Sequence, residues 1–262
     1  LVAVVGHDFP KEHLELFKEK NINTEGLQVQ EDGKTFRWKG RYGSDLNTAE
    51  TLETHLNVLE TFSPLIPDSY KNIPYVFLGN IHPALQSQVL DQVKNPKIIA
   101  LDTMNFWIEA AYEDLKKTIS RVDIVIINDA EARQLSKQDN VAKAAKEIAS
   151  WGPKALVIKQ GEYGALLYYE GEFFSSPGLP LEEVFDPTGA GDSFAGGFMG
   201  YLSSVGTLDK KTLKQAVIVG STMASFNVQE FSCDRLKRLT KPEIQERLKI
   251  FQKLSHFEDV AL

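Results

Sequence analysis

The stretch Glu183-Val-Phe-Asp-Pro-Thr-Gly-Ala-Gly-Asp-Ser-Phe-Ala-Gly-Gly-Phe-Met-Gly200 decides how the rest of this chain is interpreted. It predicts an extended segment, a glycine turn and then a helix, because Phe194 and Phe198 recur at helical spacing. Gly189 and Gly191 permit a tight turn, and the start of the helix adds unpaired N–H groups and the positive end of the helix dipole. Together these features predict an anion-binding loop.

An aspartate, Asp192, stands in the first helical turn beside this loop. A carboxylate next to bound phosphate is electrostatically unfavourable for simple binding, so its presence calls for a reason. One reason is catalytic, since an aspartate there accepts the proton of an attacking hydroxyl while the loop amides take up the charge on a transferring phosphoryl group. The alternative is that Asp192 only complements the helix dipole, as acids in a first turn often do.

Two common glycine-rich nucleotide motifs do not fit this stretch. A dinucleotide fingerprint requires a third glycine where the chain has Phe194, and a Walker loop requires a Gly-Lys-Ser/Thr triplet, which the chain lacks. The segment Asp186-Pro-Thr-Gly-Ala-Gly-Asp192-Ser-Phe-Ala-Gly-Gly197 instead resembles the C-terminal signature of the PfkB family of carbohydrate kinases, the ribokinase-like group. This segment is highly specific, and weaker correspondences extend over most of the chain.

The resemblance implies an α/β fold of the ribokinase-like kind, a three-layer sandwich with a mostly parallel central sheet, helices on both faces and a small β lid. It implies that Asp192 is the catalytic base and that an anion hole is formed by the amides of Gly189, Ala190 and Gly191. It also implies ATP and Mg²⁺ as cofactors, a sugar or sugar-like acceptor and, in part of the family, a monovalent cation such as K⁺.

The composition limits the class of protein. With 262 residues and 42% hydrophobic content the chain can bury a full core, and we expect a single kinase domain over residues 1–262. The net charge of −7 without a basic run argues against nucleic acid and membrane surfaces as partners. The single cysteine, Cys233, cannot form an intrachain disulfide, and no apolar run reaches membrane-spanning length, so we expect a cytoplasmic protein.

The first part of the chain predicts a strand over residues 1–6, a helix over 10–19 and then a small β region. Residues 27–30 and 34–42 are expected to form a hairpin, followed by a strand or extended arm over 51–58. The resemblance implies that residues 27–58 form a lid over the acceptor, and that the lids of two subunits can pair in a homodimer. Trp38 and Arg41 are candidate acceptor contacts, and ordinary packing within the lid is the alternative for Trp38. The resemblance also implies an N-terminal segment before residue 1, carrying part of the acceptor site.

From residue 75 onward, short apolar runs alternate with helical stretches. This order predicts a parallel sheet covered by helices on both faces, with ligands bound beyond the carboxyl ends of the strands. The expected strands are 75–78, 97–102, 123–128 and 155–159, and the expected helices are 83–93, 107–119, 129–151 and 208–226.

Polar residues at the expected strand ends are the next candidates. Asp102-Thr-Met-Asn105 resembles an Asp-x-Asn motif of the family with one residue inserted, which makes Asn105 a candidate acceptor contact, and Trp107 stands where some sugar kinases carry arginine. Asn128 and Glu131 have the spacing of a helix capping box. They also match the Asn-x-x-Glu motif of the family, which implies that both help to place Mg²⁺ and the phosphates through water.

Further candidates follow from the position of the nucleotide in the family. The resemblance places the turn from Gly161 to Gly164 against ATP and Lys159 near the polyphosphate, and the alternative for Lys159 is a lysine that reaches solvent. The resemblance also implies that Thr188 of the signature contacts the nucleotide. Ala224 and Asn227 border the expected adenine pocket, although small residues in a core helix explain Ala224 equally.

The sequence thus predicts a kinase that transfers the γ-phosphoryl group of ATP to a hydroxyl of a sugar or sugar-like acceptor. A nucleoside acceptor is the alternative, because Trp38, Tyr42, Phe106 and Trp107 can stack on a base. A phosphorylated sugar is a third acceptor, with the basic lid residues 37, 39 and 41 as phosphate contacts. A rival from another class is a non-catalytic sugar or nucleotide sensor on the same scaffold.

Overall fold

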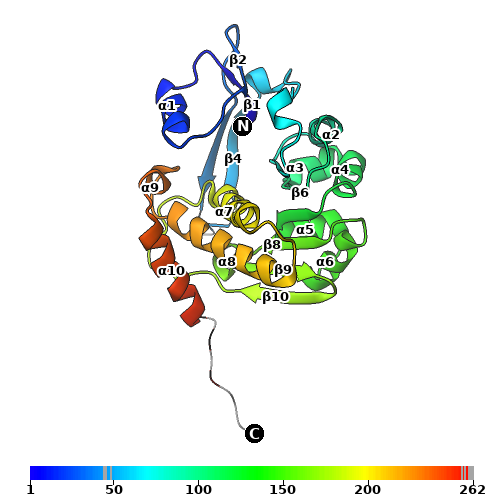
Figure 1. Ribbon diagram of the computed structural model, residues 1–262, viewed down its shortest axis with the longest axis vertical. Helices are drawn as coiled ribbons and strands as arrows, with labels where there is room; N and C mark the ends of the chain where they lie inside the picture. The colour runs from blue at the N-terminus through cyan, green and yellow to red at the C-terminus, as the bar shows by residue number, and fades with distance from the viewer. Residues whose placement is uncertain (44–45, 48, 255, 257, 259–262) are drawn as a thin grey trace. The chain divides into compact units, whose positions relative to one another are not determined.

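The computed structural model describes residues 1–43, 46–47, 49–254, 256 and 258 (Figure 1). The chain divides into two compact units, Leu1–Pro74 with Ala84–Pro96 and Tyr75–Pro83 with Lys97–Leu262. The expected single kinase domain over residues 1–262 stays a prediction. No helix in the described part of the chain is long and apolar enough to cross a membrane.

The first unit begins with β1 (Val2–Gly6), α1 (Lys11–Glu19) and β2 (Gly26–Gln30), and β2 pairs with β1 in parallel. The turn after β2 is tied to the end of β1, because the His7 amide donates to the Gly33 carbonyl oxygen at 3.0 Å. A Cβ on Gly6 would lie 2.2 Å from that same oxygen, so only glycine permits this approach. The predicted strand and helix over residues 1–19 are therefore confirmed.

The expected hairpin between residues 27–30 and 34–42 is wrong. The strand β3 (Arg37–Tyr42) pairs antiparallel with β4 (Ala49–His55), in a two-stranded sheet of its own with a register shift between Lys39 and Gly40. The turn that was expected to reverse the chain is instead bonded to the end of β1, so the chain leaves that sheet before β3 begins. The unit also contains η1 (Asn57–Leu59), η2 (Asp68–Tyr70) and, but for its first residue, α2 (Pro83–Gln92).

The second unit is built on a six-stranded mixed sheet with the order β10-β9-β8-β7-β6-β5. Its first four strands in the chain are parallel, and β9 and β10 return antiparallel. The strands are β5 (Tyr75–Leu78), β6 (Ile98–Leu101), β7 (Ile124–Asn128), β8 (Ala155–Lys159), β9 (Ala165–Tyr169) and β10 (Glu172–Ser176). The four predicted parallel strands are confirmed, whereas β10 was not predicted.

Helices cover both faces of this sheet. One face packs on α7 (Ala190–Val205) and α8 (Lys210–Asn227), where Ile124 and Ile126 join the core with Phe198. Because side chains alternate along a strand, Val125 and Ile127 point to the other face. That face is covered by α5 (Asp129–Ser136) and α6 (Val141–Ala149) (Figure 1). Strands buried on both faces with helices above and below confirm the predicted three-layer α/β sandwich.

Two of the helices expected from the apolar pattern each consist of two shorter helices in the structure. The helix expected over 129–151 consists of α5 (Asp129–Ser136) and α6 (Val141–Ala149). Lys137 ends α5 in a left-handed conformation with φ 58°, and Asn140 begins α6 because its Oδ1 accepts a hydrogen bond from the Lys143 amide at 3.0 Å. Likewise, α3 (Asn105–Ala110) and α4 (Tyr112–Ile119) replace the helix expected over 107–119.

The last helices are α9 (Asp234–Lys237) and α10 (Lys241–Leu254). α10 packs against α8, where the Arg247 guanidinium lies 3.8 Å from the ring centre of Phe226. Arg247 also donates to the Ser225 carbonyl oxygen at 3.2 Å, at the C-terminal end of α8. This contact supports the part of α8 that borders the candidate site.

Candidate active site

The glycine loop before α7 has the conformation that the sequence predicts for an anion-binding turn. Gly189 is left-handed, with φ 79°, and α7 begins at Ala190. The side chain of Asn227, which is only 3% exposed, holds the loop from the end of α8. Its Nδ2 donates to the Thr188 carbonyl oxygen and its Oδ1 accepts from the Ser193 hydroxyl, both at 2.8 Å. The loop is therefore held in shape by the protein itself.

Asp186 restrains the other end of the same loop. Its Oδ1 accepts a hydrogen bond from the Thr188 amide at 2.9 Å, and its Oδ2 accepts one from the Ser232 amide at 3.2 Å. These bonds and burial act in opposite directions on the pKa of Asp186, and the net effect is a lowered pKa. Asp186 is thus an anchor that the sequence signature contains but that was not among the candidate site residues.

The amides of the loop are partly engaged. The Ala190 amide donates to the Pro187 carbonyl oxygen at 3.1 Å, so it can contribute to an anion hole through a shared hydrogen bond. Gly191 lies in the first turn of α7, where amides lack acceptors inside the helix. Asp192 follows in the same turn and is exposed. An exposed carboxylate beside first-turn amides has the placement that the base hypothesis requires.

A half-buried lysine lies against this turn. The Lys159 ammonium lies 3.7 Å from Asp102 Oδ1 and 3.0 Å from the position that a Cβ on Gly191 would take. Lys159 is the last residue of β8, and Asp102 directly follows β6, so the carboxyl ends of the strands bring them together. The Lys159 side chain is 18% exposed and pairs with Asp102, and its predicted contact with the polyphosphate stays a prediction.

Two carboxyl groups near this lysine are deeply buried. Burial raises the pKa of Glu131 to about 7, against the opposing effects of the Lys159 ammonium and the Asn128 amide. Burial also raises the pKa of Asp102, again opposed by Lys159, and the negative charge of Asp192 raises it further. Asp102 was not among the predicted site residues, although it ends an apolar run just as Asn128 does.

The predicted capping box is confirmed at the start of α5. The Glu131 amide donates to Asn128 Oδ1 at 2.8 Å, and the Asn128 amide donates to Glu131 Oε2 at 2.7 Å. In the described part of the chain, no group of three or more acidic, histidine or cysteine side chains could hold a metal ion. Mg²⁺ does not require such a group, because it is commonly bound by one or two carboxylates together with water and substrate phosphates. Glu131 and Asn128 remain the residues predicted to hold it through water.

The turn from Gly161 to Gly164 contains η3 (Gly161–Tyr163) and depends on both glycines. Gly161 has φ 56° and Gly164 has φ 101°. A Cβ on Gly164 would lie 2.1 Å from the Ser176 carbonyl oxygen, so the turn packs closely on the end of β10. Ala224 lies on α8 and packs against the hydrophobic core. The nucleotide contacts predicted for the glycine turn and for Ala224 stay predictions.

Aromatic rings gather beyond the carboxyl ends of β5 and β6. The Trp107 ring meets His82 edge-on at 4.9 Å and Phe106 at 4.7 Å between ring centres. Phe106 is 54% exposed, and the predicted acceptor contact Asn105, at the start of α3, is exposed as well. The aromatic cluster formed by His82, Phe106 and Trp107 therefore offers an exposed ring surface in the same unit as Asp192.

The two lid candidates belong to the other unit and contact their own hairpin. The Trp38 indole Nε1 donates to Thr51 Oγ1 at 3.2 Å, and the ring covers Gly40 so closely that a Cβ there would lie 2.1 Å from it. Arg41 forms an ion pair with Glu50 at 2.7 Å. These contacts describe packing within the lid hairpin, and the acceptor contacts of Trp38 and Arg41 stay predictions.

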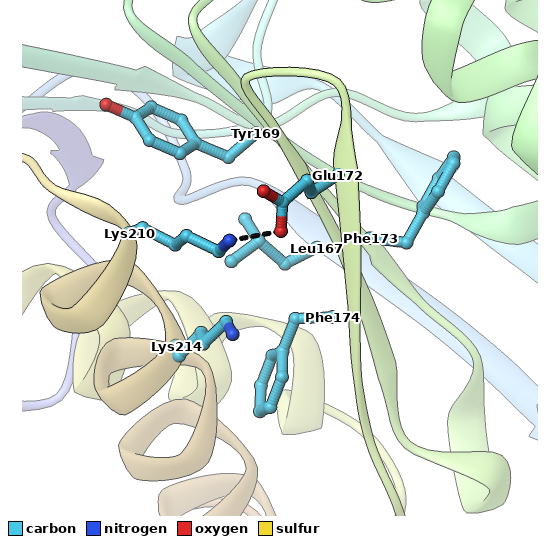
Figure 2. Close-up of a pocket in the computed structure, with 7 residues that line it drawn as sticks. All are labelled: Leu167, Tyr169, Glu172, Phe173, Phe174, Lys210 and Lys214. Atoms are coloured by element: carbon cyan, nitrogen blue, oxygen red, sulfur yellow. Dashed lines mark hydrogen bonds and ion pairs between the residues drawn. The ribbon is translucent and has the colours of Figure 1, made fainter.

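A small cavity between β9, β10 and α8 lies away from this site (Figure 2). Tyr169 on its wall pairs with Ala155, the first residue of β8, so the cavity is at the amino ends of the parallel strands. Lys210 and Glu172 form an ion pair on its rim. Its volume of about 10 Å³ is no more than one water molecule needs, so it is not a ligand site.

Comparison with known proteins identifies the family. The family model described as pfkB family carbohydrate kinase matches residues 1–238. The chain belongs to this family of kinases. The kinase is 33% identical over 210 residues to the cytidine kinase of Thermococcus kodakarensis, a match that covers 76% of this chain and 72% of that protein. Family membership confirms the predicted ATP-dependent phosphotransferase and speaks against the non-catalytic sensor.

Solved structures confirm the fold of the kinase. The nucleoside kinase of Methanocaldococcus jannaschii superposes with a TM-score of 0.75 at 21% identity, covering 95% of this chain and 80% of that chain. An E. coli protein assigned as ribokinase II, solved in complex with ATP and Mg²⁺, superposes with a TM-score of 0.78 at 18% identity over 95% of this chain and 82% of that one. The kinase therefore has the ribokinase-like fold that its signature segment predicted.

Proposed function

We propose that this kinase phosphorylates a hydroxyl on the ribose of a nucleoside. The observation that carries the choice among acceptors is the aromatic cluster of His82, Phe106 and Trp107. Aromatic rings at a ligand-binding strand edge, with Phe106 exposed, suit a flat base better than a sugar alone. The similarity to a cytidine kinase and to a nucleoside kinase supports the same choice. Trp107 also replaces the arginine that the family resemblance led us to expect in some sugar kinases.

The proposed chemistry uses groups that lie at the carboxyl edge of the sheet. Asp192 accepts the proton of the acceptor hydroxyl, whose oxygen forms a bond to the γ-phosphorus as the bond to the β-phosphate oxygen breaks and ADP leaves. Amides of Gly189, Ala190 and Gly191 and the ammonium of Lys159 stabilise the charge on the transferred group. Mg²⁺, held through water by Asn128 and Glu131, would neutralise charge on the phosphates when bound.

The test measures ADP release from Mg·ATP with cytidine, adenosine, inosine, ribose, fructose and fructose 6-phosphate as acceptors. We expect turnover with nucleosides, and Asp192→Asn should lower kcat by roughly 10²–10⁴ while ATP still binds. Asp114→Asn is the matched control, because Asp114 is also an acid in the first turn of a helix. Turnover confined to sugars would contradict the nucleoside acceptor, and full activity of Asp192→Asn would contradict the assigned base.

Three finer points belong to the proposal. A homodimer through the lid is supported by exposed apolar side chains such as Leu52 on β4, and sedimentation of wild type and Leu52→Glu tests it.

Dependence on a cation such as K⁺ is supported only by the family resemblance, and turnover in potassium and sodium salts tests it. A cytoplasmic location is supported by the single, unbridged Cys233.

A further inference from the structure

The side chain of Lys159 spans the carboxyl edge of the sheet. Its backbone pairs with Asn128 on the neighbouring strand β7, whereas its ammonium reaches Asp102 beyond β6, the next strand over. The ammonium ends against Gly191 in the first turn of α7, where a Cβ would leave it only 3.0 Å of room. The lysine therefore links a residue at the end of β6 with the anion-binding loop.

Other carboxyl groups compete for this ammonium. The charge of Lys159 acts on Glu131 as well as on Asp102, and Asp192 is close enough for its charge to act on Asp102. A lysine side chain is a flexible stem carrying a point charge, so an ammonium whose charge acts on two carboxyl groups needs a cause for staying at one of them. Asp102 provides that cause, because it is 6% exposed and its Oδ1 is oriented by the Thr103 amide at 2.9 Å.

We propose that Asp102 is a positioning residue that holds the Lys159 ammonium against Gly191, so that the cation is in place before the γ-phosphate arrives. This inference rests on the proposed function, in which Lys159 stabilises the transferred phosphoryl group. A charge fixed in advance stabilises a transition state without the cost of reorganising the site. Without the Asp102 charge, the ammonium turns toward Asp192 or Glu131, and pairing with Asp192 would also weaken the base.

The test is a double-mutant cycle on kcat with Asp102→Asn, Lys159→Met and the double variant. Asparagine has nearly the shape of Asp102 and retains an acceptor oxygen for the Thr103 amide, while it removes the charge and replaces the other carboxylate oxygen by an N–H donor. We expect Lys159→Met to lower kcat about a hundredfold. Asp102→Asn should lower it about tenfold, and the double variant should match Lys159→Met within about twofold. A double variant about a thousandfold slower than wild type would show that Asp102 acts independently of Lys159 and would overturn the inference.

Thermal unfolding separates positioning from a structural role. Asp102→Asn replaces a buried carboxyl group by a neutral one, so its Tm should equal or exceed that of wild type, and a lower Tm with unchanged kinetics would overturn the inference. Lys154→Met is the matched control. Lys154 pairs with Asp123 at 2.8 Å at the opposite, amino ends of β7 and β8, so kcat should stay at the wild-type value.

A binding measurement distinguishes failure of this inference from failure of the proposed function. If wild type phosphorylates no acceptor, the proposed function fails, and calorimetric affinity for Mg·AMP-PNP decides the inference instead. Asp102→Asn and Lys159→Met should each weaken that affinity, and the double variant should bind no more weakly than Lys159→Met. Additive weakening, or unchanged affinity in both single variants, would overturn the inference.

Discussion

Glu131 meets two demands with one carboxyl group. Its Oε2 accepts the Asn128 amide in the capping box, and burial raises its pKa to about 7. Capping needs only an acceptor oxygen, which a glutamine also provides. A buried group that changes charge near neutral pH is a common sign of a functional site. The capping role and the proposed role at the phosphates are therefore compatible, and they can be separated by removing the charge alone.

We predict a pH-dependent stability that depends on Glu131. Because the folded protein binds the proton more tightly than the unfolded chain, the free energy of unfolding in EDTA should fall as pH rises from about 4.5 to about 7. The loss due to this group is about 3 kcal/mol, from a rise of the pKa from 4.5 to about 7. Glu131→Gln should remove that part of the slope in urea titrations, and an identical slope in the variant would contradict the raised pKa.

Gly191 and Gly196 form a matched pair on the same helix. A Cβ at Gly191 enters the space of the Lys159 ammonium, whereas a Cβ at Gly196 has no atom within 4 Å. Either change to alanine should stabilise α7 by up to about 1 kcal/mol through helix propensity. Only Gly191→Ala should lower kcat, because the flexible lysine end moves away. Equal activity of Gly191→Ala and Gly196→Ala would show that the position of the ammonium is unimportant.

At the scale of elements, the anion-binding loop takes its shape from a helix that follows it in the chain. Asn227 ends α8, and both ends of its amide hold the loop, one through Thr188 and one through Ser193. Asn227 was predicted to border the adenine pocket, a role that stays a prediction. Its observed contacts show that Asn227 supports the loop. The Thr188 carbonyl oxygen needs a donor and the Ser193 hydroxyl needs an acceptor, and the side-chain amide of Asn227 provides both.

Asn227→Ala should lower the free energy of unfolding by about 1–3 kcal/mol, because it removes the two hydrogen bonds between this buried side chain and the loop. It should also raise the KM for ATP by loosening the loop. Asn227→Asp keeps the acceptor for Ser193 but places a carboxylate oxygen against the Thr188 carbonyl oxygen. It should therefore lower activity as much as Asn227→Ala does. Chemical denaturation and initial rates measure both effects, and wild-type behaviour of Asn227→Asp would argue against the donor contact.

The elements that the sequence predicted well are those whose signal is local. The four parallel strands are short apolar runs, of which β6, β7 and β8 are buried along almost their whole length, and the positions of all four are confirmed within two residues. The break at Lys137 and the pairing of β2 with β1 were missed. The single left-handed residue Lys137 does not disturb the spacing of apolar residues on either side of it, so the sequence pattern does not reveal the break. The pairing of β2 with β1 depends on contacts between two segments, and the apolar pattern within one segment carries no information about its partner.

For the molecule as a whole, binding of Mg·ATP should appear as stabilisation. At a hundredfold excess over its Kd the ligand should raise the free energy of unfolding by about 2.7 kcal/mol. For a chain of this size that corresponds to a rise in Tm of roughly 5–10 °C. EDTA should remove most of this rise, and Asp192→Asn should keep it, because the base is proposed to act on the acceptor. A rise that persists in EDTA would contradict binding of ATP with Mg²⁺.

The sequence by itself determined the fold class, the family and the proposed base, because a glycine turn followed by Asp192 is specific in its spacing. It also determined which residues end the parallel strands. The tertiary structure decided which of those ends meet, and so revealed Asp102 as the partner of Lys159 and Asn227 as the support of the loop. The physical reason is that spacing along the chain encodes local conformation, whereas burial and charge pairing arise only where separate strands and helices converge.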